Sequence, residues 1–408
     1  MNKTRLKKYA SLIAEVGVNV QKGQEVIIAA ELDQPEFVKM VVDECYKRGA
    51  SRVSVDWSYQ PLTKSHVRYC KSEVLGRLEK WQLEKWEYQA EVIPCKIYLM
   101  SEDPDGLDGI NQKKYAAAMA ARSKQIKPIR AKMENKYQWC IAAVPGREWA
   151  KKIFPGERAS VATEKLWEAI LDTSRVNDDP VRAWEEHNRD LAARCEYLNS
   201  LGIRSLRFTA GNGTDLTVGM LPDAVFAGGG EHALGSGIYF NPNIPSEEVF
   251  TSPKRGEAEG IVYSSKPLAY GGVLIEDFFV RFEGGRAVEV GAKKNEEALR
   301  ELIAMDEGAA YLGECALVPY SSPIRQSGLL FYNTLFDENA ACHLALGRGF
   351  TNLLRGYENM TEAECHERGI NDSIVHEDFM IGTEDMNIYA VDKDGNEVQI
   401  FKDGEWNF

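Results

Sequence analysis

The stretch Ile374–Gly382, IVHEDFMIG, places three titratable side chains in succession between apolar residues. If this stretch is a strand, side chains alternate between its faces, so His376 and Asp378 share one face and Glu377 points to the other. Two such residues lie about 7 Å apart at the backbone, so their tips can converge on one small cation. If His376 and Asp378 are considered alone, the better explanation is a pair of core residues that hydrogen-bond to each other.

Three other segments carry similar chemistry in largely apolar or turn-rich surroundings: Glu247 and Glu248 in FNPNIPSEEVFTSP, Glu314 in YLGECALVPYSSPI, and Glu338 and His343 in FYNTLFDENAACHLALG. Each alone could be a helix cap, a turn acid or the solvated end of a loop. Together with the first segment they favour metal binding. A carboxylate-rich set without thiols suits Zn²⁺, Co²⁺, Mn²⁺ or Mg²⁺ rather than a structural cysteine–zinc site. The number of ligands exceeds what one catalytic zinc needs and predicts a two-metal site with a bridging carboxylate.

Several familiar motifs are absent from the sequence. It has no H-E-x-x-H, no G-x-S-x-G, no Walker loop, and no G-x-G-x-x-G after the first expected strand. The glycine-rich stretch 228–237, GGGEHALGSG, lacks the Lys-Ser/Thr ending of a phosphate loop and is expected to be a flexible turn. The chain therefore offers no sequence reason to bind a nucleotide.

The first half of the chain alternates short apolar runs with helical stretches. Strands are expected at 25–30, 52–57, 95–100 and 139–144, with amphipathic helices between them. Strands separated by helices of this length predict parallel βαβ units, and hence an α/β domain with a parallel sheet flanked by helices over residues 1–197.

The second half has a different pattern. Strand-like runs are joined by Asn-Gly, Gly-Gly and Asp-Gly turns, beginning with a hairpin around Asn212-Gly213, and one clear helix is expected at 295–304. Residues 198–408 are thus predicted to form a β-rich α+β domain that holds the metal site and is catalytic.

Composition excludes some classes of function. The 408 residues carry a formal net charge of -13, which argues against a general nucleic-acid binder because phosphate neutralisation needs a basic surface. The basic start of the chain leads into an amphipathic helix rather than a signal peptide, and no apolar run approaches the roughly 18 residues of a membrane span. The eight scattered cysteines are expected to be reduced, as in a cytoplasmic protein.

The four metal-ligand segments, in this order and spacing, resemble the aminopeptidase T family of metallo-aminopeptidases, and the start KYASLIAEVGVNVQKGQEVII is similar to that family too. The resemblance implies a homodimer that removes the N-terminal residue from peptides by a metal-activated water. It implies six metal ligands: Glu248, Glu314, Glu338, His343, His376 and Asp378. Glu314 would bridge two ions, and Glu338 could instead support the ligands. Glu247 is the local candidate for proton transfer, although alternation along an extended chain would point it away from Glu248.

Two positions depart from the family pattern. Phe350 stands where the family has a tyrosine placed to assist catalysis, and Lys254 stands where it often has a histidine. If the phenol is needed, Tyr332 or another group could replace it, or the substrates could differ. Two alternatives therefore stay open: a metal-dependent hydrolase of another amide or ester, and a binding homologue with an impaired site.

Overall fold

The computed structural model describes residues 2–271 and 273–408. By the density of its contacts the chain divides into two compact units, one of residues 1–185 with 230–245 and one of residues 186–229 with 246–408. The predicted division after residue 197 falls inside helix α9 (Pro180–Ser200), which begins in the first unit and continues in the second. Two separately folding domains with that boundary remain a prediction.

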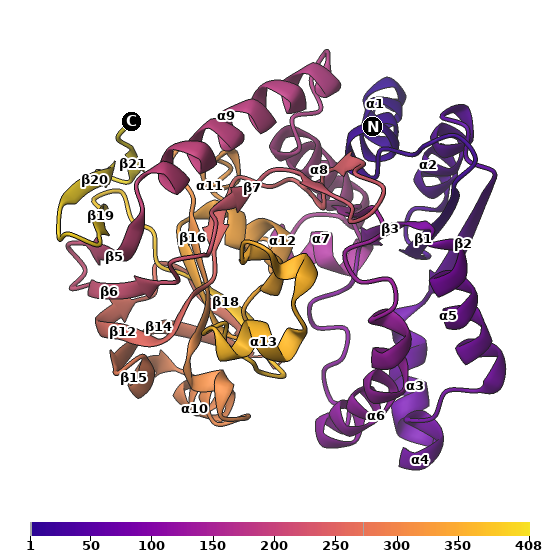
Figure 1. Ribbon diagram of the computed structural model, residues 1–408. Helices are drawn as coiled ribbons and strands as arrows, with labels where there is room; N and C mark the ends of the chain where they lie inside the picture. Colours follow the sequence, from indigo (N-terminus) through magenta and orange to yellow (C-terminus); the bar gives the residue numbers. More distant parts are fainter. Residues whose placement is uncertain (1, 272) are drawn as a thin grey trace. The chain divides into compact units, whose positions relative to one another are not determined.

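The first unit is built on a parallel sheet with the strand order β10-β4-β3-β1-β2. Figure 1 labels its strands β1, β2 and β3. Its strands are β1 (Glu25–Glu31), β2 (Arg52–Ser58), β3 (Cys95–Met100), β4 (Trp139–Ala143) and β10 (Asn243–Ile244). The apolar side chains of Val26 and Ile28 are buried at alternate positions of β1. The predicted α/β unit with a parallel sheet is confirmed.

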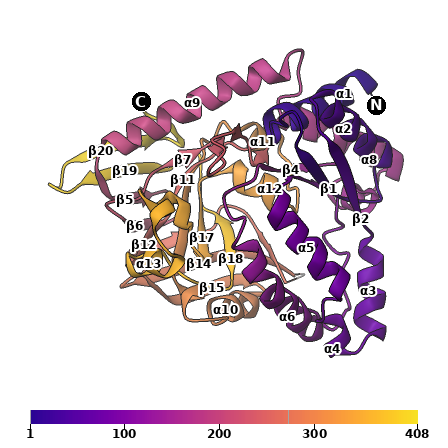
Figure 2. The same cartoon turned by 45° about the vertical axis from the view of Figure 1, so that its right-hand side comes forward.

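Helices cover both faces of this sheet. From β1 the chain crosses to β2 and then returns past β1 to β3, and right-handed crossovers in opposite directions place their helices on opposite faces. One group comprises α1 (Lys3–Leu12), α2 (Pro35–Lys47) and α8 (Ala159–Thr173), joined by the rings of Tyr9, Phe37 and Trp167. Figure 2 shows α3 (Gln60–Tyr69), α5 (Lys80–Val92) and α6 (Gln112–Arg130) on the other side. The remaining helices are α4 (Ser72–Leu75) and α7 (Arg147–Ile153).

Residues 230–245 belong to the first unit although they lie in the range predicted for the second domain. Strands β8 (Glu231–His232) and β9 (Tyr239–Phe240) form a small hairpin where a flexible turn was expected. Its continuation is anchored by backbone hydrogen bonds, from Asn241 N to Gly17 O (2.8 Å) and from Ile141 N to Pro242 O (2.7 Å). These long-range bonds leave no trace in the local pattern of the sequence.

The second unit contains two sheets that share one hydrophobic core. The larger has the order β13-β14-β12-β6-β5-β19-β20-β21, with β15 beside β14. Its strands are β5 (Ile203–Thr209), β6 (Asp215–Met220), β12 (Pro253–Tyr263), β13 (Leu268–Tyr270), β14 (Val273–Glu283), β15 (Arg286–Lys294), β19 (Asn387–Asp392), β20 (Glu397–Lys402) and β21 (Glu405–Trp406). The predicted hairpin is confirmed: β5 pairs with β6 around Gly213, whose φ of +100° suits glycine.

The smaller sheet of this unit has the order β18-β17-β16-β11-β7. Its strands are β7 (Ala227–Gly228), β11 (Val249–Thr251), β16 (Leu312–Leu317), β17 (His343–Gly347) and β18 (His376–Met380), and they all pair antiparallel. The unit also includes α10 (Glu296–Ile303), close to its predicted bounds, and the short helices α11 (Pro323–Gln326), α12 (Thr334–Asp337) and α13 (Glu362–Glu367). The predicted β-rich α+β architecture is confirmed.

Candidate metal centre

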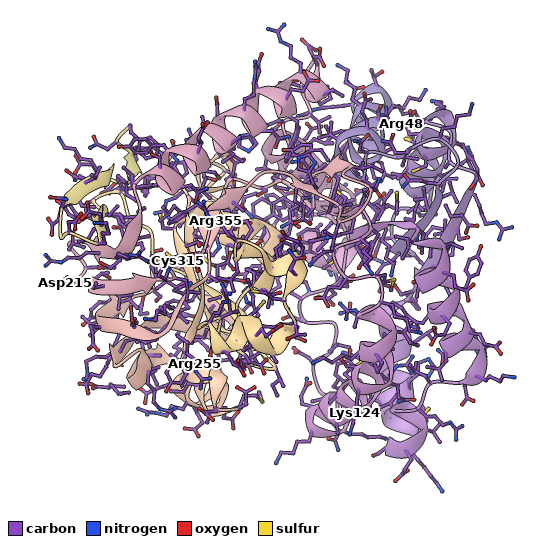
Figure 3. All side chains as sticks on the ribbon, viewed as in Figure 1. Arg48, Lys124, Asp215, Arg255, Cys315 and Arg355 are labelled. Atoms are coloured by element: carbon purple, nitrogen blue, oxygen red, sulfur yellow. The ribbon has the colours of Figure 1, made fainter. Side chains whose placement is uncertain are left out.

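The smaller sheet of the second unit has apolar side chains on one face and titratable side chains on the other, because side chains alternate along each strand. Cys315, labelled in Figure 3, lies on β16 and belongs to the buried core of the second unit, as does Leu344 on β17. Their neighbours Glu314 and His343 therefore point to the opposite face. This face carries the residues that the sequence predicted to bind metal.

Strand register brings these residues together. Glu314 on β16 is paired with Ala345 on β17, which is paired with Asp378 on β18. The small side chain of Ala345 separates the two carboxylates along one row. Glu248 precedes β11 and shares the face of Phe250, which is paired with Ala316 beside His343.

A first cluster consists of Glu248, Glu314 and His343, whose nearest ligand atoms all lie within 4.8 Å of one another. His343 Nε2 is 3.2 Å from Glu248 Oε2. The other ring nitrogen, Nδ1, lies 3.1 Å from the backbone carbonyl of Ala341. A hydrogen bond from Nδ1 to that carbonyl leaves Nε2 as the free ligand atom, as is usual for histidines that bind metals.

A second cluster consists of Glu314, His376 and Asp378, again with ligand atoms within 4.8 Å. His376 Nε2 is 3.1 Å from Glu314 Oε2 and 3.5 Å from Asp378 Oδ1. Its Nδ1 lies 2.7 Å from the carbonyl of Arg348, which fixes this ring in the same tautomer as His343. Glu314 is common to both clusters.

Glu338 reaches the same region from the turn before β17. It is not in either cluster, but its charge and those of Glu248 and Asp378 act on one another. Buried Asn339 orients this turn: its side chain donates to Leu335 O at 3.0 Å and to Glu338 Oε1 at 3.3 Å. Nothing in the sequence pattern had indicated a role for Asn339.

Glu247 lies close to a different partner. Its carboxylate is 3.9 Å from Nε2 of buried His187, and its backbone N–H donates to Asn339 Oδ1 at 2.7 Å. The pairing with His187 agrees with the alternation that points Glu247 away from Glu248.

Crowding of acids perturbs the pKa values of the clusters. Burial, followed by the charges of Asp378 and Glu248, raises the pKa of Glu314 to about 7, against the effect of His376. Burial and the same two charges raise the pKa of Glu338 well above its usual value.

The pKa values of the two histidines are raised, although burial alone would lower them. Burial lowers the pKa of His343, but the hydrogen bond and charge of Glu248 outweigh it and raise the pKa to about 10. For His376 the interactions with the carboxylates of Asp378 and Glu314 likewise outweigh burial and raise the pKa. Both shifts show an excess of negative charge at this face.

The described part of the chain supplies no lysine or arginine to balance this charge by an ion pair with Glu248, Glu314 or Asp378. Asp378 Oδ1 is buried and has no hydrogen-bond partner among the described residues. Buried carboxylates with a free ligand atom and two tautomer-fixed histidines are the donor set of a divalent-cation site. The residues present therefore fit a metal.

Residues 2–406 match the family model of the thermophilic metalloproteases, M29. The chain belongs to this family. It is 42% identical over 406 residues to aminopeptidase AmpS of Bacillus subtilis, covering 99% of this chain and 98% of that protein. It is 40% identical to aminopeptidase T of Thermus thermophilus, with the same coverage. The solved structure of wild-type AmpT from Thermus thermophilus matches with a TM-score of 0.92 at 39% identity and covers both chains fully. The resemblance inferred from the sequence is confirmed.

The edge strand of this M29 chain is shorter than expected. We predicted a strand from Ile374, but β18 begins at His376, and Ile374 is 78% exposed. The backbone N–H of Ile374 donates to Asp306 Oδ2 at 2.7 Å and so leaves the sheet. A Cβ on Gly347, opposite His376, would lie 2.1 Å from Val375 O, so glycine is required for this close approach.

The two departures from the family pattern have definite places. The ring of Phe350 packs on that of His376, with centroids 5.0 Å apart, and also contacts Phe250. Lys254 forms an ion pair with Glu257, away from the two clusters. Phe350 therefore contributes an apolar surface beside a candidate ligand.

Proposed function

We propose that this M29 metalloprotease is an aminopeptidase that removes the N-terminal residue from peptides at a centre of two divalent ions. The observation that carries the proposal is that Glu314 belongs to both clusters, as a bridging carboxylate must. The proposed ligands are Glu248, Glu314, Glu338, His343, His376 and Asp378. Zn²⁺, Co²⁺, Mn²⁺ and Mg²⁺ suit such a set.

A bound divalent cation supplies a water of pKa near 7 and polarises the substrate carbonyl. The protein residues hold this chemistry in place. Glu314 is common to both clusters, and the carbonyls of Ala341 and Arg348 hold the Nδ1 protons of His343 and His376, so that Nε2 of each ring is the ligand atom. Asn339 holds Glu338 against the same face.

Hydrolysis also needs a group that carries a proton to the leaving amine. We assign this step to Glu247, which adjoins ligand Glu248 in the chain and has His187 and Asn339 to orient it. The free α-amine of the substrate would bind to a carboxylate of the centre, which limits cleavage to the first peptide bond.

Substitution Glu247→Gln tests this assignment. The variant should retain its metal, because Glu247 is in neither cluster, and should lose roughly 10²–10⁴-fold in kcat, the usual contribution of a general acid or base. Metal content and kcat are measured on the same preparation. Full turnover with bound metal would remove Glu247 from the mechanism.

We further propose a cytoplasmic homodimer that acts on peptides with a free N-terminus and binds neither nucleic acid nor membrane. The net charge of -13 and the eight free cysteines support this setting. No helix in the described ranges is both long enough and apolar enough to cross a membrane. Light scattering coupled to size-exclusion chromatography should give about twice the chain mass of 45.8 kDa.

The decisive experiment combines metal analysis with an activity assay. Protein treated with a chelator and reloaded with each cation in turn should bind two ions per chain and release aniline from aminoacyl anilides. Metal without aniline release would favour a hydrolase of another amide or ester. Failure to bind metal would favour the impaired binding homologue that Phe350 suggests.

A further inference from the structure

A cavity of about 60 Å³ lies entirely within the second unit and opens on the metal centre. Two candidate ligands, Glu338 and Asp378, line one part of it. A substrate whose first carbonyl lies at the centre would therefore place its first side chain in this cavity.

The position of β18 explains how one cavity reaches side chains from both faces of a strand. β18 is the edge of its sheet, so the cavity can extend around its open side. Asp378 enters from the ligand face, whereas Glu377 enters from the opposite face, where it is paired with Leu346. At the last residue of β18, the backbone N–H of Ser265 donates to Met380 O at 2.8 Å.

Apolar residues form about half of the cavity wall. They include Leu268 on β13, Leu274 on β14, Leu330 and Met380. Such walls suit the methylene groups of an unbranched side chain.

Glu377 is the carboxyl group of this cavity that has no assigned task. Asp337, which also lines it, accepts backbone hydrogen bonds from Phe331 (2.9 Å) and Asn333 (3.1 Å). By contrast, the structure shows no hydrogen bond or ion pair of the Glu377 carboxylate with any residue it describes. A half-buried carboxylate without a protein partner is available to bind a cation that enters the cavity.

Size distinguishes the basic side chains. The cavity volume is the space open to the centre of a water molecule, and one water needs about 10–15 Å³ of it. The cavity therefore offers about four to six water-sized positions. The five side-chain heavy atoms of lysine match this number, with the stem along the leucines and the ammonium group at Glu377.

We propose that Glu377 is a specificity-determining residue that selects peptides with N-terminal lysine. The inference rests on the proposed aminopeptidase function. The reacting bond lies at the metal centre, and Glu377 binds the distal ammonium group of the substrate side chain.

The test compares the p-nitroanilides of L-lysine and L-norleucine, which differ by the terminal amino group. The wild-type enzyme should favour lysine in kcat/KM. Substitution Glu377→Gln should reduce the lysine-to-norleucine ratio roughly ten- to hundredfold, the value of a hydrogen bond to a charged group, mainly through a higher KM for lysine. The matched control Glu397→Gln, at an exposed position of β20, should leave the ratio unchanged.

Three results would overturn the proposal: a wild-type ratio below one, an unchanged ratio in Glu377→Gln, or loss of bound metal in that variant, which would make Glu377 a positioning residue for its neighbours. Norleucine hydrolysis separates these results from failure of the proposed function. If neither anilide is cleaved by metal-loaded wild-type enzyme, the aminopeptidase assignment falls and this inference falls with it.

Discussion

Substitution Glu314→Gln is expected to remove metal from both clusters and to lower kcat/KM at least about a thousandfold. The loss corresponds to about 4 kcal/mol of transition-state stabilisation. The reason is that the clusters share this one carboxylate, and a neutral amide cannot supply an anionic oxygen to each. Glutamine has nearly the same shape, so the buried strand β16 should keep its register.

Metal analysis and steady-state kinetics on the same sample check this result. The control is Glu297→Gln on α10, an exposed position that should leave metal content and kcat/KM unchanged. If Glu314→Gln retains two ions and more than a tenth of the activity, the two clusters do not depend on a shared carboxylate.

Removal of the metal is expected to lower the thermal midpoint by about 10 °C at pH 7. A cation at a thousand times its Kd stabilises the folded chain by about 4 kcal/mol, and each kcal/mol shifts the midpoint of a unit this size by about 2–4 °C. Calorimetry of chelated and reloaded protein measures the difference, and an unchanged midpoint would show that the cation does not support the fold.

The difference in thermal midpoint between metal-loaded and metal-free protein should grow as the pH rises. In the metal-free chain the pKa of Glu314 is raised to about 7, above its unfolded value of 4.5, so stability falls as pH rises between these values. His343, with its pKa raised from 6.5 to about 10, loses its stabilising contribution as pH rises through that higher range. Metal binding has the opposite dependence because its ligands must be deprotonated. Removal of the metal should therefore lower the thermal midpoint least near pH 4.5.

The sequence predicted helices and strands well where buried side chains repeat at the regular spacing of the element. β3 has the predicted bounds Cys95–Met100, and β4 ends one residue before the predicted end at position 144. The strand that carries His376 was predicted to begin two residues too early, because the bond from Ile374 to Asp306 joins segments 68 positions apart. Contacts of this kind are not encoded in the neighbouring residues.

The same limit applies to the site. Residue types and the family resemblance singled out the members of both clusters, which the register of β16, β17 and β18 places together. Asn339 was missed because an asparagine in a turn is ordinary until its burial is known. Glu377 was set aside as pointing away from the ligands, and only the edge position of β18 shows that it shares a cavity with Asp378.

The order of strands in the five-stranded sheet has a consequence for biosynthesis. Glu248 and Asp378 are 130 positions apart, and β18 is the last strand of this sheet to leave the ribosome. A nascent chain that ends before His376 already holds the residues of the first cluster but only Glu314 of the second. Long-range pairing of this kind is slow, so we expect both candidate clusters to be complete only in a finished chain.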